Sequence, residues 1–277
     1  MPELPEVETV VRGLQDPLTS QRIEEVQVDD ERLLRNASPE EFKSEVIHQP
    51  ISKVERLGKY IVFHLTENLL FAIHLRMTGR LLLCGNEDAN TDYRRLQLGL
   101  TRHQLVMDDM RRFGTLDLLH SVNEDPLGGI GLEPLGESYT WERFRNLFRN
   151  SGREIKRLLL DQSVVAGIGN IYASEILHRA QVSPWTRAEE LEEDKLQDLY
   201  QAIPNTLSEA IQKGGSTIDT FKNSQGTSGD FQLQLKVYDS EDQPCPECGT
   251  AIQKAKQGGR STFFCPSCQA REFNKGP

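Results

Sequence analysis

Apolar residues near the start of the chain recur with the spacing of one face of a helix. They stand at i, i+3, i+4 and i+7, as Val7, Val10, Val11 and Leu14, and this period predicts an amphipathic helix. Pro5 suits the first turn of that helix, where the missing N–H of proline would have no partner anyway. Asp16-Pro17 should end it, because the residue before a proline disfavours the helical conformation.

The pattern changes to short apolar runs from about residue 51 to residue 119, separated by polar turn signals such as Gly85-Asn86-Glu87-Asp88. Short runs between turns are typical of strands. They occur at Tyr60 to Phe63, Leu69 to Ile73, Arg80 to Leu83 and Gln104 to Met107. This part of the chain is therefore predicted to be a β-sandwich or a barrel with a helix at its start.

The second half of the chain reads as helical. Between the halves, residues 123–136 hold four Gly and two Pro without either period, which predicts a linker between domains. The pattern is helical from Thr140 to about Lys213, and glycines then predict a mobile loop. Residues 231–238 alternate as a strand.

The charge of the chain is uneven. Its net value of -10 argues against a protein that coats nucleic acid by charge over its whole surface. Acids are concentrated in residues 1–50, with 12 acids and 5 bases, and in residues 186–235, with 9 acids and 4 bases. A basic run lies between these blocks and is either a solvated helix face or a phosphate-facing patch: Arg143, Arg145, Arg149, Arg153, Lys156 and Arg157.

Hydrophobic residues make up 37% of the chain, enough for a core. The longest apolar runs are far too short to span a membrane, and no secretion-signal pattern opens the chain. We therefore expect no membrane association.

Four of the five cysteines form two pairs near the end of the chain. Cys245 and Cys248 make one CxxC knuckle, and Cys265 and Cys268 make another, with 16 residues between the two knuckles. This spacing predicts one tetrahedral zinc ion, with disulfides or free thiols as the less favoured alternatives. Four protein ligands close the site, so the zinc should be structural.

Two predicted helices flank a glycine-containing turn, Gly167-Ile168-Gly169. The first runs from Arg153 to Gln162, and Asn170 is a suitable N-cap for the second. A helix N-terminus offers unpaired N–H groups to an anion. Beside the basic run, the pair is either a clamp for the DNA backbone or an ordinary helical hairpin.

Three motifs together resemble the bacterial formamidopyrimidine-DNA glycosylases: Met1-Pro-Glu-Leu-Pro-Glu-Val-Glu8, Gly167-Ile-Gly-Asn-Ile-Tyr-Ala-Ser-Glu175 and the two knuckles. The resemblance implies an α+β multidomain fold: an N-terminal β-sandwich with flanking helices, a helix-two-turn-helix domain and a C-terminal zinc finger. We expect a catalytic sandwich domain over 1–122, a hinge over 123–139, the helical domain over 140–235 and a zinc-finger hairpin over 236–277.

The resemblance also implies a bifunctional glycosylase and AP lyase that excises oxidised purines in base excision repair. Removal of Met1 would leave Pro2 as a secondary amine. An α-amine titrates near about 8, so a useful fraction is neutral at pH 7 and can attack C1′ to form an iminium. By resemblance, Glu3 is the general acid and base, and Glu6 lies near the same site. Lys59 matches a strand lysine that contacts phosphate at the lesion and donates a proton in β-elimination. Arg260 matches a zinc-finger arginine that holds phosphate and assists δ-elimination.

The same resemblance assigns contacts to DNA. Extrusion of a nucleotide leaves a gap in the duplex, which Met77, Arg111 and Phe113 are expected to fill. His74 and Asn170 match phosphate contacts, and Arg153 or Lys156 adds another. Tyr93 stands where many relatives have a histidine that contacts DNA. Residues 214–230 are expected to cap the flipped base.

Damaged double-stranded DNA is thus the expected partner of a monomeric, cytoplasmic, nucleoid-associated enzyme with one structural Zn²⁺ and no organic cofactor. Two alternatives stay open. One is an endonuclease VIII-like glycosylase for oxidised pyrimidines, and the other is a zinc-bearing DNA-binding protein without catalysis.

Overall fold

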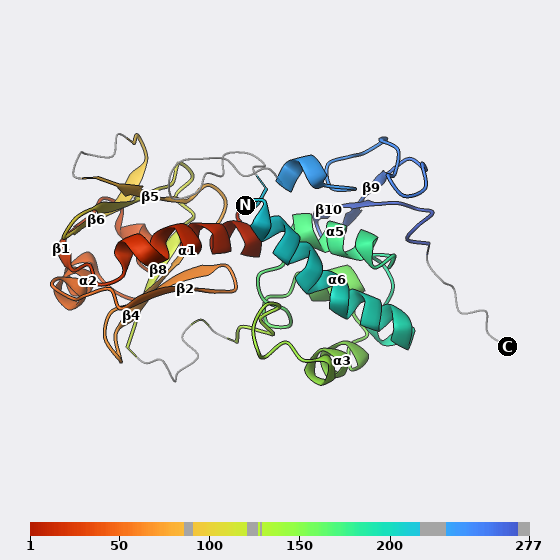
Figure 1. Ribbon diagram of the computed structural model, residues 1–277, viewed down its shortest axis with the longest axis horizontal. Helices are drawn as coiled ribbons and strands as arrows, with labels where there is room; N and C mark the ends of the chain where they lie inside the picture. The colour runs from red at the N-terminus through yellow and green to blue at the C-terminus, as the bar shows by residue number, and fades with distance from the viewer. Residues whose placement is uncertain (86–90, 121–126, 128, 217–230, 271–277) are drawn as a thin grey trace. The chain divides into compact units, whose positions relative to one another are not determined.

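The structure, a computed structural model, describes residues 1–85, 91–120, 127, 129–216 and 231–270 (Figure 1). It divides into two units. The first joins Met1–Gly128 with Ala210–Gln232, and the second joins Gly129–Glu209 with Leu233–Pro277. The expected linker 123–139 and capping loop 214–230 lie partly outside the described residues, and the domain boundaries given above stay predictions.

Helix α1 (Leu4–Leu18) forms on the predicted apolar face. Leu4, Val7, Val10 and Leu14 are fully buried, and the helix packs against strands β2 (Lys53–Leu57) and β3 (Tyr60–His64). The predicted end at Asp16-Pro17 was slightly early, because the helix holds Pro17 within its last turn. A proline there removes only one hydrogen-bond donor close to the frayed end.

Two separate four-stranded antiparallel sheets follow. Of the two predicted alternatives, the fold is therefore a sandwich and not a closed barrel. One sheet has the order β1-β6-β7-β5 and the other the order β2-β3-β4-β8. The remaining strands are β1 (Ile23–Val28), β4 (Leu70–His74), β5 (Arg80–Cys84), β6 (Arg94–Leu100), β7 (Gln104–Asp108) and β8 (Thr115–Leu119).

The core of the sandwich lies between the sheets and is completed by α1 and by α2 (Pro39–Val46). Phe63 and Phe71 stack there with ring centroids 4.5 Å apart, and Phe42 of α2 meets Phe71 edge-on at 5.6 Å. Helix α2 was not predicted, although Ser38 and Glu41 form a capping box that marks its start. A short 3-10 turn, η1 (Glu31–Leu33), precedes it.

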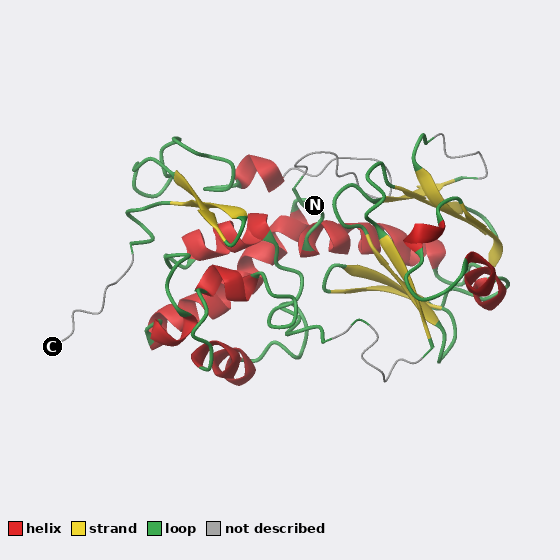
Figure 2. Cartoon of the chain, turned by 180° about the vertical axis from the view of Figure 1, so that it is seen from behind, coloured by secondary structure: helices red, strands yellow, loops and turns green. Residues whose placement is uncertain are grey.

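Helices α3 (Trp141–Arg149), α4 (Ile155–Leu159) and α5 (Asn170–Arg179) belong to the second unit, while α6 (Glu193–Gln212) crosses the division between units. The 3-10 turn η2 (Ala188–Glu190) precedes α6. A two-stranded hairpin of β9 (Gln253–Gln257) and β10 (Arg260–Phe264) packs its second strand against α5 (Figure 2). None of the described helices is long and apolar enough to cross a membrane.

The predicted strand over residues 231–238 was wrong. The chain forms a single 3-10 turn there, η3 (Phe231–Gln234), and then leaves regular structure. The reason is a buried carboxylate on α5. Glu175 accepts the backbone N–H groups of Lys236, Val237 and Tyr238 at 2.8–3.0 Å, so these donors satisfy a side chain instead of a neighbouring strand.

Candidate active site and metal centre

The N-terminal residues expected to do the chemistry are buried at the start of α1. Glu3 is its N-cap, and its backbone N–H donates to Glu6 Oε2 at 2.8 Å in a capping box. Both carboxylates are 2% exposed, and Pro2 directly before them is buried as well. The positive end of the α1 helix dipole lies at this group.

The second oxygen of Glu6 joins α1 to the described start of the expected capping loop 214–230. Ser216 N–H donates to Glu6 Oε1 at 2.8 Å. Gly215, with φ +77°, leaves room for this contact, because a Cβ there would lie 3.0 Å from Glu6 Oε1. The Gly215 carbonyl accepts from Phe231 N–H at 3.0 Å. Glu6 therefore fixes the described flank of the loop, whose residues 217–230 lie outside the described part.

Lys59 lies in the two-residue turn between β2 and β3, which corrects the expectation of a strand lysine. The preceding Gly58 has φ +58°, as the first central residue of a type II′ turn requires. Unusually for a turn lysine, Lys59 is only 7% exposed.

His74 ends β4 and is held as a neutral ring. It is 7% exposed, and burial, with the cations of Arg76, Lys59 and Arg35, lowers its pKa to about 3. Arg76 N–H donates to its Nδ1 at 2.9 Å. The ring hydrogen must then sit on Nε2, where a neutral imidazole can donate to a phosphate oxygen.

The three residues expected to fill the gap in the duplex lie on two neighbouring loops of the first unit. Met77 is 37% and Phe113 50% exposed, unusually high values for large apolar side chains. The guanidinium carbon of Arg111 lies 4.8 Å from the centre of the Phe113 ring, so the two side chains stack.

One buried carboxylate, which the sequence analysis missed, ties these loops together. Asp109 is 1% exposed. It accepts from the Thr78 hydroxyl next to Met77, from Arg111 N–H at 3.2 Å and from Gly114 N–H at 2.8 Å. In the sequence, the only feature that could have drawn attention to Asp109 is its place in the run Asp108-Asp109-Met110-Arg111, just before Arg111. Asp109 thus sets the relative position of the two exposed loops.

Tyr93 lies on the surface of the same unit and is 41% exposed. Its carbonyl accepts the backbone N–H of Asp109 at 2.9 Å. The side chain of Tyr93 is therefore accessible from solvent. The hydrogen bond to Asp109 holds its backbone in place.

In the second unit, Lys156 corrects an expectation. It is 1% exposed, and its Nζ donates to the Ser261 carbonyl at 2.9 Å and to Thr262 Oγ1 at 2.8 Å. It therefore anchors strand β10 and is not an exposed phosphate contact. Asn170 is likewise the first residue of α5 and not its N-cap, which is Gly169. Its Nδ2 donates to the same Ser261 carbonyl at 3.0 Å.

The predicted basic run is partly neutralised. Arg145 and Arg149 both pair with Glu193, at 2.6 and 2.7 Å, and Arg153 pairs with Asp161 at 2.8 Å. These pairs are exposed and therefore weak, so a phosphate can replace the carboxylate. The predicted helix from Arg153 to Gln162 is shorter, because α4 covers only Ile155–Leu159.

A basic hollow of about 290 Å³ lies where α4 meets the β9–β10 turn. Gly258 and Gly259 make that turn, with φ values of +56° and +82°, as a type I′ hairpin requires. The turn leaves Arg260 exposed at the start of β10. The hollow is lined by Arg153, Arg157, Leu160, Asp161, Gln257, Gly258 and Arg260. Three guanidinium groups against one carboxylate favour an anion.

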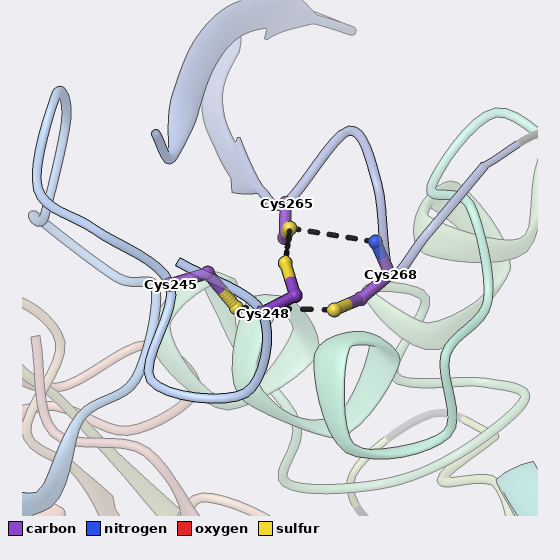
Figure 3. A group of neighbouring side chains, drawn as sticks. All are labelled: Cys245, Cys248, Cys265 and Cys268. Carbon is purple, nitrogen blue, oxygen red and sulfur yellow. Dashed lines mark hydrogen bonds between the residues drawn. The ribbon is translucent and has the colours of Figure 1, made fainter. Parts of the chain in front are cut away.

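The four paired cysteines form one cluster (Figure 3). Their sulfur atoms lie within 4.8 Å of one another, with 3.5 Å between Cys248 and Cys265 and 3.9 Å between Cys245 and Cys268. Zn–S bonds of about 2.3 Å in a tetrahedron require sulfurs about 3.8 Å apart. The donor set and its spacing fit one zinc ion, held by Cys245, Cys248, Cys265 and Cys268, with no position left for a substrate.

Family models match successive parts of the chain. The formamidopyrimidine-DNA glycosylase N-terminal domain matches residues 1–116, the H2TH domain of the same glycosylase matches residues 130–222, and a zinc finger found in FPG and IleRS matches residues 242–271.

Similar proteins cover the chain almost completely. The formamidopyrimidine-DNA glycosylase of Pelotomaculum thermopropionicum is 43% identical over 97% of this chain and 99% of its own length, and that of Bacillus subtilis is 40% identical over 98% and 100%. Among solved structures, MutM in complex with carbocyclic 8-oxo-G containing DNA has a TM-score of 0.90 at 36% identity, over 98% of this chain and 100% of that one.

A complex of Lactococcus lactis Fpg with DNA that contains an abasic site has a TM-score of 0.90 at 35% identity, over 97% and 100% of the two chains. The same three successive domains, the four-cysteine centre and these matches over nearly the whole length lead to one conclusion: the chain belongs to the formamidopyrimidine-DNA glycosylase family.

Proposed function

We propose that this chain is a bifunctional DNA glycosylase and AP lyase that removes 8-oxoguanine and formamidopyrimidines from duplex DNA. The observation that carries the proposal is the N-terminal Pro2, buried beside Glu3 at the positive end of α1. A secondary amine in that position can act as a nucleophile once Met1 is removed. A DNA substrate also implies a cytoplasmic enzyme working at the nucleoid.

The reaction begins when the Pro2 nitrogen attacks C1′ of the damaged nucleotide. The bond from C1′ to the base breaks, and the base leaves with its electron pair. Glu3 accepts the amine proton as a general base, the C1′–O4′ bond opens, and the nitrogen forms a double bond to C1′. The proton that O4′ needs comes from Glu3, the carboxyl group nearest in sequence to the nucleophile.

The iminium then serves as an electron sink that acidifies the hydrogen on C2′. Loss of that proton expels the 3′ phosphate, and a second elimination expels the 5′ phosphate. Lys59, little exposed at its turn, supplies a proton in the first elimination, and Arg260 on the exposed hairpin holds phosphate in the second. Hydrolysis of the iminium frees Pro2 for another cycle.

The remaining site residues position the DNA. Met77 and Phe113 are exposed apolar side chains that can enter a base stack, and Arg111 beside them can hydrogen-bond the orphaned partner base. His74, Asn170, Arg153 and Tyr93 contribute contacts to the backbone. The zinc ion does no chemistry on the substrate, because it only holds the hairpin that carries Arg260.

Excision assays on two duplexes test the substrate class. One duplex carries 8-oxoguanine opposite cytosine and the other carries thymine glycol opposite adenine. We expect faster release of 8-oxoguanine under single-turnover conditions. A preference for thymine glycol would contradict the purine assignment and support the endonuclease VIII-like alternative.

A further inference from the structure

A buried histidine of helix α5 lies against the metal centre. His178 is in the last turn of α5, and 2% of it is exposed. Its Nε2 lies 3.3 Å from Cys245 Sγ. Neither the proposed glycosylase reaction nor the four-cysteine ligand set uses this residue, so its role requires a separate explanation.

His178 is not itself a metal ligand in this structure. Within the part of the chain that is described, the group of side chains able to hold a metal together consists of the four cysteines. The histidine stands outside that group and approaches a single sulfur. A tetrahedral site closed by four thiolates has no room for a fifth donor. The contact therefore belongs to the surroundings of the zinc and not to its ligands.

The position of the ring hydrogen follows from the two nitrogens. Nδ1 of His178 is buried and finds no hydrogen-bond partner among the described residues. With the hydrogen on Nδ1, a buried N–H would be orphaned and the Nε2 lone pair would face an electron-rich sulfur. With the hydrogen on Nε2, the N–H points at the thiolate. The second arrangement satisfies both the donor and the sulfur.

We propose that His178 donates its Nε2–H to the Cys245 thiolate of the zinc-loaded protein and thereby secures the first knuckle to α5 and slows loss of the metal. A hydrogen bond to a charged acceptor is about twice as strong as one between neutral groups. Donation also withdraws electron density from a sulfur in a site with four negative thiolates and one divalent ion. That sulfur is then a poorer target for protons and for competing metals.

The second knuckle is fastened to the same end of α5 by a separate contact. Gln269 accepts Cys265 N–H at 2.9 Å and donates to the Val182 carbonyl just beyond α5 at 3.0 Å. His178 is the counterpart for the first knuckle. His178 is a positioning residue that acts through Cys245. At the opposite end of α5, Asn170 donates to the Ser261 carbonyl of the hairpin that the cysteine knuckles hold.

Two substitutions separate the donor from the packing. His178→Phe keeps a buried ring but removes the N–H, whereas His178→Gln places an amide N–H close to the position of Nε2. We expect zinc transfer from the full-length protein to a chelator to be about tenfold faster in H178F, and within about twofold of the unsubstituted rate in H178Q. Unchanged release in H178F, or equally fast release in both variants, would overturn the proposal.

A spectroscopic measurement reports on the sulfur itself. In cobalt-substituted protein, the sulfur-to-cobalt charge-transfer band of H178F should shift to lower energy, while the tetrahedral ligand-field bands stay in place. H178Q should retain the original band position. A ligand-field spectrum that indicates a nitrogen ligand in the unsubstituted protein, and changes to four sulfurs in H178F, would overturn the assignment of His178 as a non-ligand.

The unsubstituted zinc protein provides a test that does not depend on the folding of a variant. Imidazole ¹⁵N shifts and couplings show which ring nitrogen of His178 carries the hydrogen. We expect Nε2–H, with Nδ1 bare. A hydrogen on Nδ1 would leave the thiolate without a donor from His178 and would refute the proposal.

Discussion

Individual side chains in this protein owe their roles to burial more than to residue type. Lys59, Lys156, Glu6 and Glu175 are all ionisable residues, and all are at most 7% exposed. Groups of this type are mostly found on surfaces unless they are paired. Sequence patterns cannot reveal such burial, and this is why the position of Lys156 beneath strand β10 was not predicted.

His74 should make the stability of the protein depend on pH. Its pKa is about 3 in the folded protein and about 6.5 when unfolded. Between these values only the unfolded chain binds the proton, so the free energy of unfolding should fall as pH drops below about 6.5, by at most about 1.4 kcal/mol per pH unit.

His74→Gln removes this contribution, and chemical denaturation at a series of pH values measures it. Other titrating groups contribute to the absolute slope, so the comparison with the unsubstituted protein is decisive. His120→Gln, at an exposed position, is the matched control. Equal pH dependence of H74Q and the unsubstituted protein would show that His74 is not held neutral.

At the scale of elements, Asp109 connects the loops that carry Met77, Arg111 and Phe113. Asp109→Asn turns one acceptor oxygen into a donor that faces the N–H groups of Arg111 and Gly114. We expect a loss of about 1–3 kcal/mol in the free energy of unfolding. Excision should slow about tenfold, because small displacements of positioning groups are costly.

The control for Asp109 is Asp117→Asn, another buried carboxylate of the same unit, which pairs with Arg35 and not with the two loops. Fluorescence of 2-aminopurine opposite the lesion reports on gap filling. D109N should weaken that signal change and D117N should not. Equal effects of both substitutions would attribute the result to general destabilisation.

Lys156 and Arg260 lie close in the fold but should behave differently. Lys156→Met leaves the Ser261 carbonyl and Thr262 hydroxyl without a charged donor, and we expect about 1–3 kcal/mol less stability. In the K156M variant, the dependence of DNA affinity on salt concentration should be the same as in the unsubstituted protein. Arg260→Ala should instead reduce the slope of log affinity against log salt by about 1. A reduced slope for K156M would restore Lys156 as a phosphate contact.

The elements that sequence patterns predicted well are those with strong local signals. The apolar face of α1 and the two cysteine knuckles were read correctly, because each depends on spacing over a few residues. The strand expected at 231–238 failed because Glu175, about sixty residues away, takes the backbone donors of Lys236, Val237 and Tyr238. Asp109 was missed because residue type does not reveal its burial, and because its contact with the distant Thr78 is set by tertiary structure.

For the molecule as a whole, the net charge of -10 does not oppose a DNA substrate. Glu193, from the second acidic block, pairs with Arg145 and Arg149 of the basic run. Exposed pairs of this kind contribute little to stability. Their exchange for phosphates would release the acidic partner to solvent and would keep non-specific affinity low.

Zinc removal should affect one part of the molecule more than the other. The centre holds the hairpin of β9 and β10 through all four cysteines, and such small metal sites rarely keep their fold without the ion. After treatment with a strong zinc chelator, amide hydrogen exchange should accelerate over residues 242–269 and affinity for DNA should fall, while protection of the sandwich strands persists. Unchanged exchange in the hairpin would contradict a structural role for zinc.

The central claim is that the amine of Pro2 is the nucleophile. Borohydride reduction during incubation with an abasic duplex tests it most directly, because it converts the iminium to a stable covalent adduct. Protein whose N-terminus is Pro2, verified by mass spectrometry, should form an adduct at that residue, and Pro2→Gly or retention of Met1 should weaken or abolish it. Absence of an adduct from the correctly processed protein would contradict the account.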